Sequence, residues 1–254
     1  MSSSSDLTAT LPLFLSFLLT LFALAWFSRQ LSRQIQTVLV LLTRNADLTM
    51  VLLFLLLLPG VIIHEGAHWL TARLLGLKTG KFRVWPKKQG KHIGLGSVSV
   101  QRGNLAQDTL VGMAPLIAGS ILVALIAEHS FHAPRISTAL GEWRWLDGWH
   151  AFRLALQEPD GVLWAYLLFA ISNAMMPSAS DREPVQPLLL YTAVAIVIYI
   201  LLGLPLTLFT TILHWLAPIL QNLVNAFLFT GILDCVVWAV LYLITQLIAP
   251  RRSA

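Results

Sequence analysis

The sequence predicts an all-α polytopic membrane protein with about six transmembrane helices. Of its 254 residues, 57% are hydrophobic and only 11% are charged, whereas an average soluble domain is about one quarter charged. A membrane-spanning helix needs about 20 mostly apolar residues. Stretches of this kind lie at roughly residues 9–27, 50–76, 109–127, 160–177, 187–208 and 222–248. The connections between them leave no room for a soluble domain of ordinary size.

The N-terminal region, residues 1–49, divides into a first transmembrane helix and an amphipathic linker. Its opening, MSSSSDLTAT, lacks the basic stretch of a secretory signal, so we expect the first helix to be retained in the membrane. Residues 28–47 place Arg29, Arg33 and Arg44 around a short apolar patch. That patch is too small to cross a bilayer, and we expect it to lie outside the hydrocarbon core.

The connection after the second apolar stretch contains the only β pattern in the chain. Hydrophobic residues alternate imperfectly around Gly96, at Ile93, Leu95, Val98 and Val100. The sequence KQGK at 88–91 supplies a turn. We predict a short β-hairpin over about residues 81–101, which is either re-entrant and shielded by protein or a basic hairpin at the surface.

Lysine and arginine predict the orientation of the chain in the membrane. In a six-helix topology, ten of them lie on one side, seven of these within residues 77–108, and six lie on the other. The positive-inside rule therefore places both termini and the 77–108 connection in the cytoplasm, by default at a prokaryotic plasma membrane. The net charge of +5 has the same explanation, so we expect a bilayer and no nucleic acid as partner. A single cysteine, Cys235, excludes an internal disulfide.

Three residues in the second apolar stretch predict metal chemistry. The run LLLLPGVIIHEGAHWLTARLLG contains His64, Glu65 and His68 as an HExxH motif. Histidines at i and i+4 share one helix face and can bind one zinc ion, while the adjacent glutamate can reach a water at the metal. These groups follow fourteen apolar or small residues. Burying them there is costly unless a cation or neighbouring helices offset the cost.

A catalytic zinc site needs a third protein ligand, and two aspartates are candidates. Asp181 follows the fourth apolar stretch, whereas Asp234 lies within the sixth. In the predicted topology His64, His68 and Asp181 lie near the cytoplasmic ends of their helices, but Asp234 lies in the middle or outer half of its own. We therefore favour Asp181 as the ligand, and for Asp234 we favour a helix–helix hydrogen bond over a proton relay.

Three segments together resemble the site-2 protease family of zinc-dependent intramembrane metalloproteases. HEGAHWLTARLLGLKTGKFRVWP is similar to the family's first motif, GMAPLIAG at 112–119 to its small-residue and proline segment, and Asn173, Pro177 and Asp181 to its second motif. The resemblance implies a three-helix metalloprotease-like core over residues 50–182, followed by two transmembrane helices in 183–254. It also implies a re-entrant hairpin that presents a strand edge to the substrate, and a substrate-binding role for Asn173.

The resemblance implies hydrolysis of a peptide bond in or near a transmembrane segment of a membrane-protein substrate. His64, His68 and Asp181 hold one Zn²⁺ and Glu65 is the general base. Two alternatives are close to this function. The first is an inactive relative of the family that binds membrane proteins. The second is a membrane zinc hydrolase with the same metal chemistry but a non-peptide substrate. The first is motivated by Arg182, which follows the aspartate where the family usually has glycine. A transporter that uses Asp234 and the histidines is a third alternative, although no repeat symmetry is visible. The sequence does not fix the oligomeric state.

Overall fold

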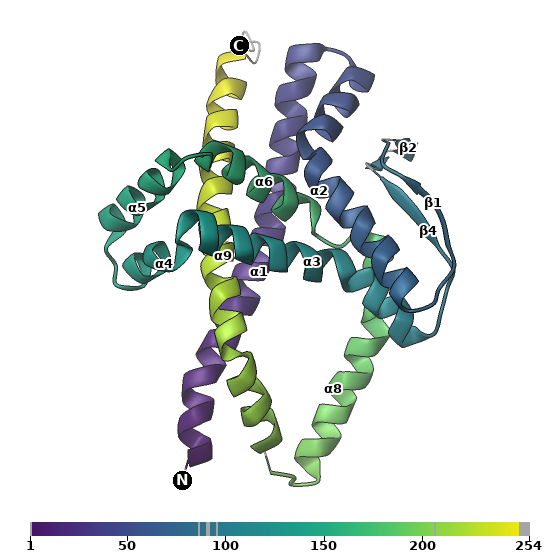
Figure 1. The fold of residues 1–254 in the computed structure, drawn as a ribbon, viewed down its shortest axis with the longest axis vertical. Coiled ribbons are helices and arrows are strands. Elements are labelled where there is room, and N and C mark those ends of the chain that lie inside the picture. Colours follow the sequence, from purple (N-terminus) through teal and green to yellow (C-terminus); the bar gives the residue numbers. More distant parts are fainter. Residues whose placement is uncertain (1, 86, 90–91, 95, 206, 249–254) are drawn as a thin grey trace, which may run out of the picture.

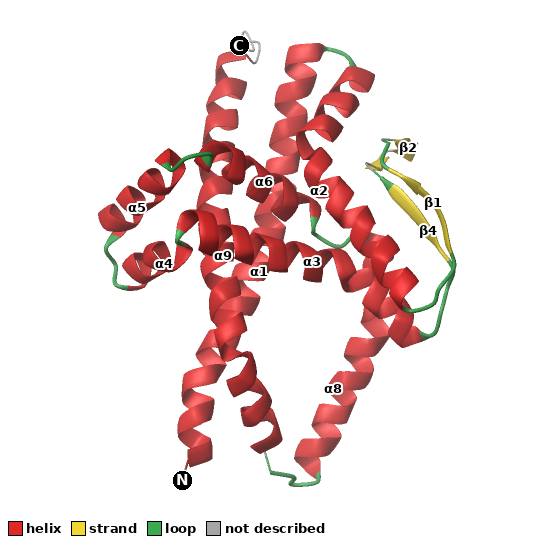
Figure 2. Cartoon of the chain, in the orientation of Figure 1, coloured by secondary structure: helices red, strands yellow, loops and turns green. Residues whose placement is uncertain are grey.

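The protein is an almost entirely helical polytopic membrane protein (Figures 1 and 2). The computed structural model describes residues 2–85, 87–89, 92–94, 96–205 and 207–248. Within these residues, five helical stretches are long and apolar enough to cross a membrane: Leu11–Thr43, Ala46–Leu74, Leu105–Phe131, Ala179–Leu201 and Phe209–Ile248. The predicted fold class is confirmed, although the stretch expected at 160–177 is a helix of only 14 residues.

Nine helices and one small β region, which lies between the second and third helices, make up the described residues. The helices are α1 (Ser2–Thr43), α2 (Ala46–Leu74), α3 (Leu105–Phe131), α4 (Ala133–Gly141), α5 (Trp145–Gln157), α6 (Gly161–Ala174), α7 (Ala179–Arg182), α8 (Val185–Leu201) and α9 (Thr207–Ile248). The strands are β1 (Thr79–Arg83), β2 (Lys87–Gln89), β3 (His92–Gly94) and β4 (Ser97–Val100). Helix α9 begins 15 residues before the predicted start at 222, because Pro218 lies inside it and does not end it.

Most of the expected amphipathic linker at residues 28–47 is helical, because α1 continues without a break to Thr43; its place outside the hydrocarbon core stays a prediction. Leu31, Ile35 and Val38 are buried at the three- to four-residue spacing of one helix face. This face packs along α9, and Gln34 Nε2 donates a hydrogen bond of 2.8 Å to Thr245 Oγ1 near the end of α9. Packing against α9 therefore extends the first helix beyond the length that a membrane requires.

The two ends of the chain lie at opposite ends of the molecule's long axis (Figure 1). Helices α1 and α9 run side by side, and both run from the lower end to the upper end of the view. The sequence-based topology had both termini on the same side of the membrane because it counted six crossings. By length and composition five helices of the described residues could cross a membrane, and α6 is a shorter apolar helix, so the predicted orientation with both termini in the cytoplasm stays a prediction.

Close helix packing around α6 gives the site its rigid frame. A Cβ atom added at Gly60 of α2 would overlap the carbonyl oxygen of Ala170, and one added at Gly119 of α3 would overlap Met175. Glycine at these two positions therefore lets α2 and α3 approach the α6 segment closely. On the other side of the core, Phe131 of α3 stacks on Phe229 of α9, with 4.6 Å between ring centroids.

The four strands confirm the predicted hairpin. Strand β1 pairs with β4, and β2 pairs with β3, both antiparallel, so one hairpin carries two short ladders. Its predicted turn includes Gly90 and Lys91, which lie outside the described residues. The hairpin lies beside α2 (Figure 1), and the rings of Trp85 and Phe54 are 5.8 Å apart. Its re-entry into the membrane stays a prediction.

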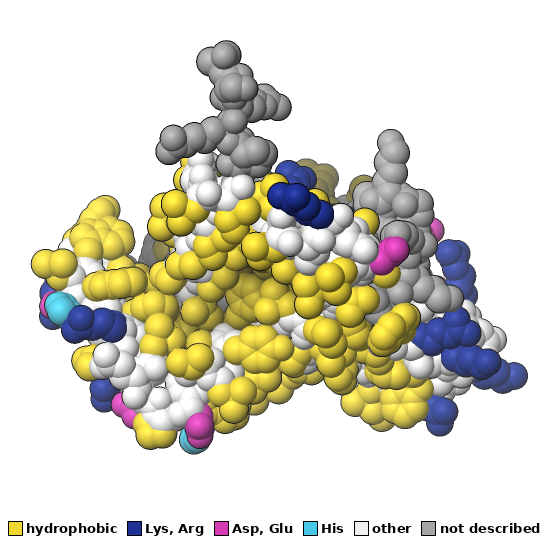
Figure 3. All heavy atoms as spheres, turned by 90° about the horizontal axis from the view of Figure 1, so that it is seen from above, with side chains coloured by type: hydrophobic (Ala, Val, Ile, Leu, Met, Phe, Trp, Pro, Cys, Tyr) yellow, Lys and Arg dark blue, Asp and Glu magenta, His cyan; other side chains and the backbone are white. Residues whose placement is uncertain are grey.

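Most of the basic side chains seen in Figure 3 lie at the right of the view, with a few others at the left and at the top of a largely apolar surface. Lys78, Lys81 and Arg83 are exposed in and just before β1. The rest of the surface seen in this view is mostly hydrophobic, as expected for helices that face lipid.

Candidate metal centre

Helix α2 supplies two of the three side chains of a compact polar group. The helix begins after Asn45, whose side chain accepts hydrogen bonds from the backbone N–H groups of Asp47 and Leu48. His64 and His68 lie one turn apart on the same face, and their Nε2 atoms are 3.3 Å apart. The rings meet edge to face, with 4.9 Å between centroids. The two nitrogens therefore converge on one point, as the motif predicts.

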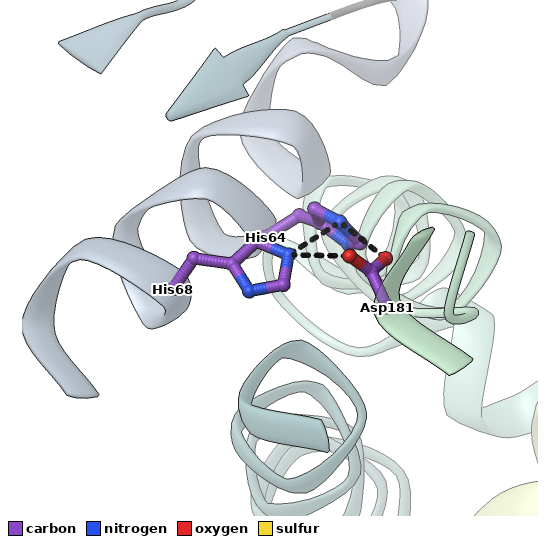
Figure 4. A group of neighbouring side chains, drawn as sticks. All are labelled: His64, His68 and Asp181. Atoms are coloured by element: carbon purple, nitrogen blue, oxygen red, sulfur yellow. Dashed lines mark hydrogen bonds and ion pairs between the residues drawn. The ribbon is translucent and has the colours of Figure 1, made fainter. Parts of the chain in front are cut away.

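The third side chain, Asp181, comes from the short helix α7. Ser178 caps this helix: its Oγ accepts the N–H of Asp181 at 3.3 Å, and its own N–H donates to Asp181 Oδ2 at 2.7 Å. This reciprocal cap holds the carboxylate toward the histidines (Figure 4). Asp181 Oδ1 is 3.4 Å from His68 Nε2, and Asp181 Oδ2 is 3.7 Å from His64 Nε2.

These three side chains could hold one metal ion. Zinc bonds of about 2.0–2.1 Å in tetrahedral geometry place two ligand atoms about 3.3 Å apart. The two Nε2 atoms are 3.3 Å apart, and the distances of 3.4 and 3.7 Å from His68 and His64 are to the two different oxygens of Asp181. With one ligand atom from each residue, all three atoms lie within 4.8 Å of one another, and each side chain is only 11–14% exposed. Two imidazoles and one carboxylate are also a donor set that zinc accepts in catalytic sites. Among the described residues, this group is the one that meets the spacing of a metal site.

Helix α3 holds both halves of the group in place. The backbone carbonyl of Val111 is 2.8 Å from His68 Nδ1 and orients that ring. The next residue, Gly112, lies so close to the carbonyl oxygen of Asp181 that any side chain at 112 would overlap it. One turn earlier, Thr109 Oγ1 donates to the carbonyl oxygen of Pro184 at 3.0 Å. Through these contacts α3 sets the distance between α2 and α7.

Glu65 lies beside the group and faces the hairpin. It is buried, and its carboxylate lies close enough to the backbone of Val98 to interact with it. A Cβ atom added at Gly96 would lie 2.7 Å from Glu65 Cγ and 2.8 Å from Oε1. The side chain therefore occupies the space that the missing side chain at 96 leaves open. This arrangement keeps Glu65 out of the three-residue group but next to it.

A cavity of about 440 Å³ lies against the three-residue group and Glu65. Its walls include His64, Glu65, His68, Asp181 and Asn173, together with residues 96–98 of the hairpin. A second cavity of about 460 Å³ shares His68 and Asp181 and extends toward Arg102 and Glu183 at the surface. The polar group therefore lies between two cavities, and residues of the hairpin line both of them.

Asn173 and Asp234 are paired with one another. Asn173 Nδ2 donates to Phe169 O at 2.9 Å within α6 and to Asp234 Oδ1 at 3.1 Å on α9. Asp234 is fully buried and is not part of the three-residue group. The helix–helix hydrogen bond expected for Asp234 is present. The substrate-binding role of Asn173 stays a prediction, although Asn173 lines the cavity.

Three supporting features were not predicted from the sequence. The backbone carbonyl of Val111 carries no side-chain signal, but a proline four residues later, at 115, marks a carbonyl that lacks its helical partner. The sequence marks Gly96 within the β pattern and Gly112 within a small-residue segment, but not their contacts, which are with Glu65 and Asp181, far away in the sequence. The cap of Asp181 had one: Ser178-Ala179-Ser180-Asp181 matches the serine-to-acid spacing of a capping box.

The fold and the site together define a polytopic membrane protein with a buried His-His-Asp group that can hold a divalent metal. No protein-family model matches the chain, and neither a curated protein nor a solved structure matches it.

Proposed function

We propose that the protein is a zinc-dependent intramembrane endopeptidase that hydrolyses a peptide bond in or near a transmembrane segment of a membrane-protein substrate. The observation that carries this proposal is the convergence of His64, His68 and Asp181 inside an apolar helical bundle, with Glu65 in the same cavity. A polar group of this kind is costly at membrane depth and marks a functional site by default. The likeness of the motifs to the site-2 protease family supports the same reaction.

His64, His68 and Asp181 would hold the zinc ion, and Glu65 would act as the general base. Zinc bound there supplies Lewis acidity toward a carbonyl oxygen and acidifies a water molecule. Glu65 accepts a proton from water in the cavity and then donates it to the leaving amine. Its contact with the hairpin at Gly96 and Val98 keeps the carboxylate beside the cavity during both transfers.

The hairpin supports a peptide as the substrate. Residues 96–98, at the start of β4, line the same cavity as Glu65. A helical substrate hides its amide bonds within its own hydrogen bonds, so it must unwind locally before hydrolysis. A strand edge can hold the unwound segment by main-chain hydrogen bonds. In this proposal the partners are a transmembrane protein and the bilayer.

The test compares zinc content and cleavage in the full chain, purified in detergent. We expect about one zinc per wild-type chain, a loss of zinc in His64→Ala, and no loss in His150→Ala, which changes an exposed histidine of α5. Glu65→Gln is expected to keep zinc and to lose cleavage of a fluorogenic single-span model peptide by about 10²- to 10⁴-fold.

Two results would count against the proposal. Folded wild type without zinc would refute a metalloenzyme, and Glu65→Gln with wild-type cleavage would refute the general base. Zinc binding without peptide cleavage would instead favour a binding protein or a hydrolase of a non-peptide substrate. Elemental analysis shows whether the wild-type protein contains zinc, and it requires no substrate.

A further inference from the structure

The hydrogen bond between His68 and Val111 depends on a missing N–H group in α3. In a regular α-helix the carbonyl of residue 111 accepts the N–H of residue 115. Residue 115 is proline, which has no N–H group. The Val111 carbonyl is therefore free of its usual partner, and it lies 2.8 Å from His68 Nδ1 in a buried contact.

This contact also selects the form of the His68 ring. A backbone carbonyl can only accept a hydrogen bond, so Nδ1 must carry the proton. Nε2 of the neutral ring is then left with its lone pair, and this is the atom that faces His64 Nε2 at 3.3 Å and Asp181 Oδ1 at 3.4 Å. A metal ligand needs this form of the ring, with the lone pair on the metal-facing nitrogen.

We propose that Pro115 is a positioning residue of the metal centre, which acts by freeing the Val111 carbonyl to hold His68. The inference rests on the proposed zinc site and adds to it a residue that contacts neither metal nor substrate. Restoring an N–H at position 115 draws the Val111 carbonyl back toward the helix axis. His68 then loses its fixed orientation, although all three ligand side chains remain.

Another helical proline provides a matched comparison. Pro218 removes the same type of hydrogen bond within α9, where the carbonyl left without its helical partner belongs to His214. Both Pro218 and His214 are exposed, and neither contributes to the metal group. A substitution there changes a helical proline without affecting the orientation of a ligand.

The experiment measures zinc affinity of the full chain in detergent, by competition with a chromophoric chelator. Pro115→Ala and Pro115→Gly both restore the N–H but differ in helix propensity by about 1 kcal/mol. We expect both to weaken zinc binding by about 10- to 100-fold, as other changes beside a metal ligand do. Pro218→Ala is expected to keep wild-type affinity. Alanine favours the helix, so loss of folding is not expected.

A second measurement is independent of metal. In metal-free protein, ¹⁵N NMR of the histidines should show His68 protonated at Nδ1 in wild type and mixed between the two nitrogens in Pro115→Ala. Wild-type affinity and an unchanged ring form in both Pro115 variants would overturn the inference. Wild type that binds no zinc would overturn the proposed function instead, and the inference with it.

Discussion

Replacing Gly112 with alanine should separate the two halves of the metal group. The Cβ atom of Gly112→Ala would lie closer than 3.0 Å to the carbonyl oxygen of Asp181, a distance that real Cβ atoms essentially never show. It would also lie 3.2 Å from the carbonyl carbon. Neither neighbour is the end of a flexible side chain, so the backbone of α7 or of α3 must move.

The size of the movement follows from the contact distances. Ordinary contacts begin at 3.4 Å, so the oxygen must shift by more than 0.4 Å relative to α3. Metal sites tolerate ligand displacements of about 0.2 Å. If α7 moves, Asp181 leaves the group; if α3 moves, the Val111 carbonyl pulls away from His68. Either response weakens the site, and we expect a loss of zinc affinity on the order of 100-fold.

Zinc competition on the purified chain measures this loss, and Gly66→Ala is its control. Gly66 lies inside the HExxH motif, but a Cβ atom added there meets no atom within 4 Å. We therefore expect Gly66→Ala to bind zinc like wild type. Overpacking at 112 should also lower the free energy of unfolding by about 1–3 kcal/mol. Wild-type zinc affinity in a folded Gly112→Ala protein would refute the argument that α3 sets the ligand spacing.

Two further predictions separate the roles of neighbouring groups. In Gly96→Ala the new Cβ lies 2.7 Å from Glu65 Cγ, so the carboxylate must move. We expect wild-type zinc content, with cleavage reduced by about 10²-fold or more. Loss of zinc in this variant would contradict the prediction. Asp234→Ala removes the α9 partner of the half-buried Asn173 amide, which keeps its bond to Phe169 O, and should destabilise the protein by about 1 kcal/mol in denaturant unfolding. Asp234→Asn keeps an acceptor and should cost less, and zinc loss in Asp234→Ala alone would show that Asp234 is a ligand after all.

The fold could be predicted as far as local apolar length determines it. The long apolar helices and the hairpin follow from hydropathy and from period-two alternation. The ends of α1 and α9 do not, because their extra turns are stabilised by packing against one another, as the bond between Gln34 and Thr245 shows. Helix α6 was expected to be longer because residues 160–177 are apolar, but it ends at Ala174, shortly before Pro177.

The candidate site could be predicted where its geometry is local. His64 and His68 are separated by one helical turn, so their spacing follows from the sequence alone. The position of Asp181 relative to them depends on 112 residues of intervening chain. The predicted topology favoured Asp181 over Asp234 only because it places Asp181 nearer the cytoplasmic end of a helix. Structure brings Asp181 to the histidines and pairs Asp234 with Asn173.

The contacts of α3 with His68 and Asp181, which were not predicted, come from one turn of that helix. Val111 and Gly112 are consecutive: the first offers a carbonyl to His68 of α2, and the second offers open space to the backbone of Asp181 in α7. Pro115, one turn later, frees the carbonyl. Each contact depends on the absence of an atom, an N–H in one case and a Cβ in the other. The sequence shows both absences, at Pro115 and Gly112, but not which distant residue makes use of them. Pro115→Ala should therefore weaken the hydrogen bond between the Val111 carbonyl and His68. Gly112→Ala should displace the backbone of Asp181. Because both changes act on the same ligand cage, the double variant should lose less zinc affinity than the two single losses combined.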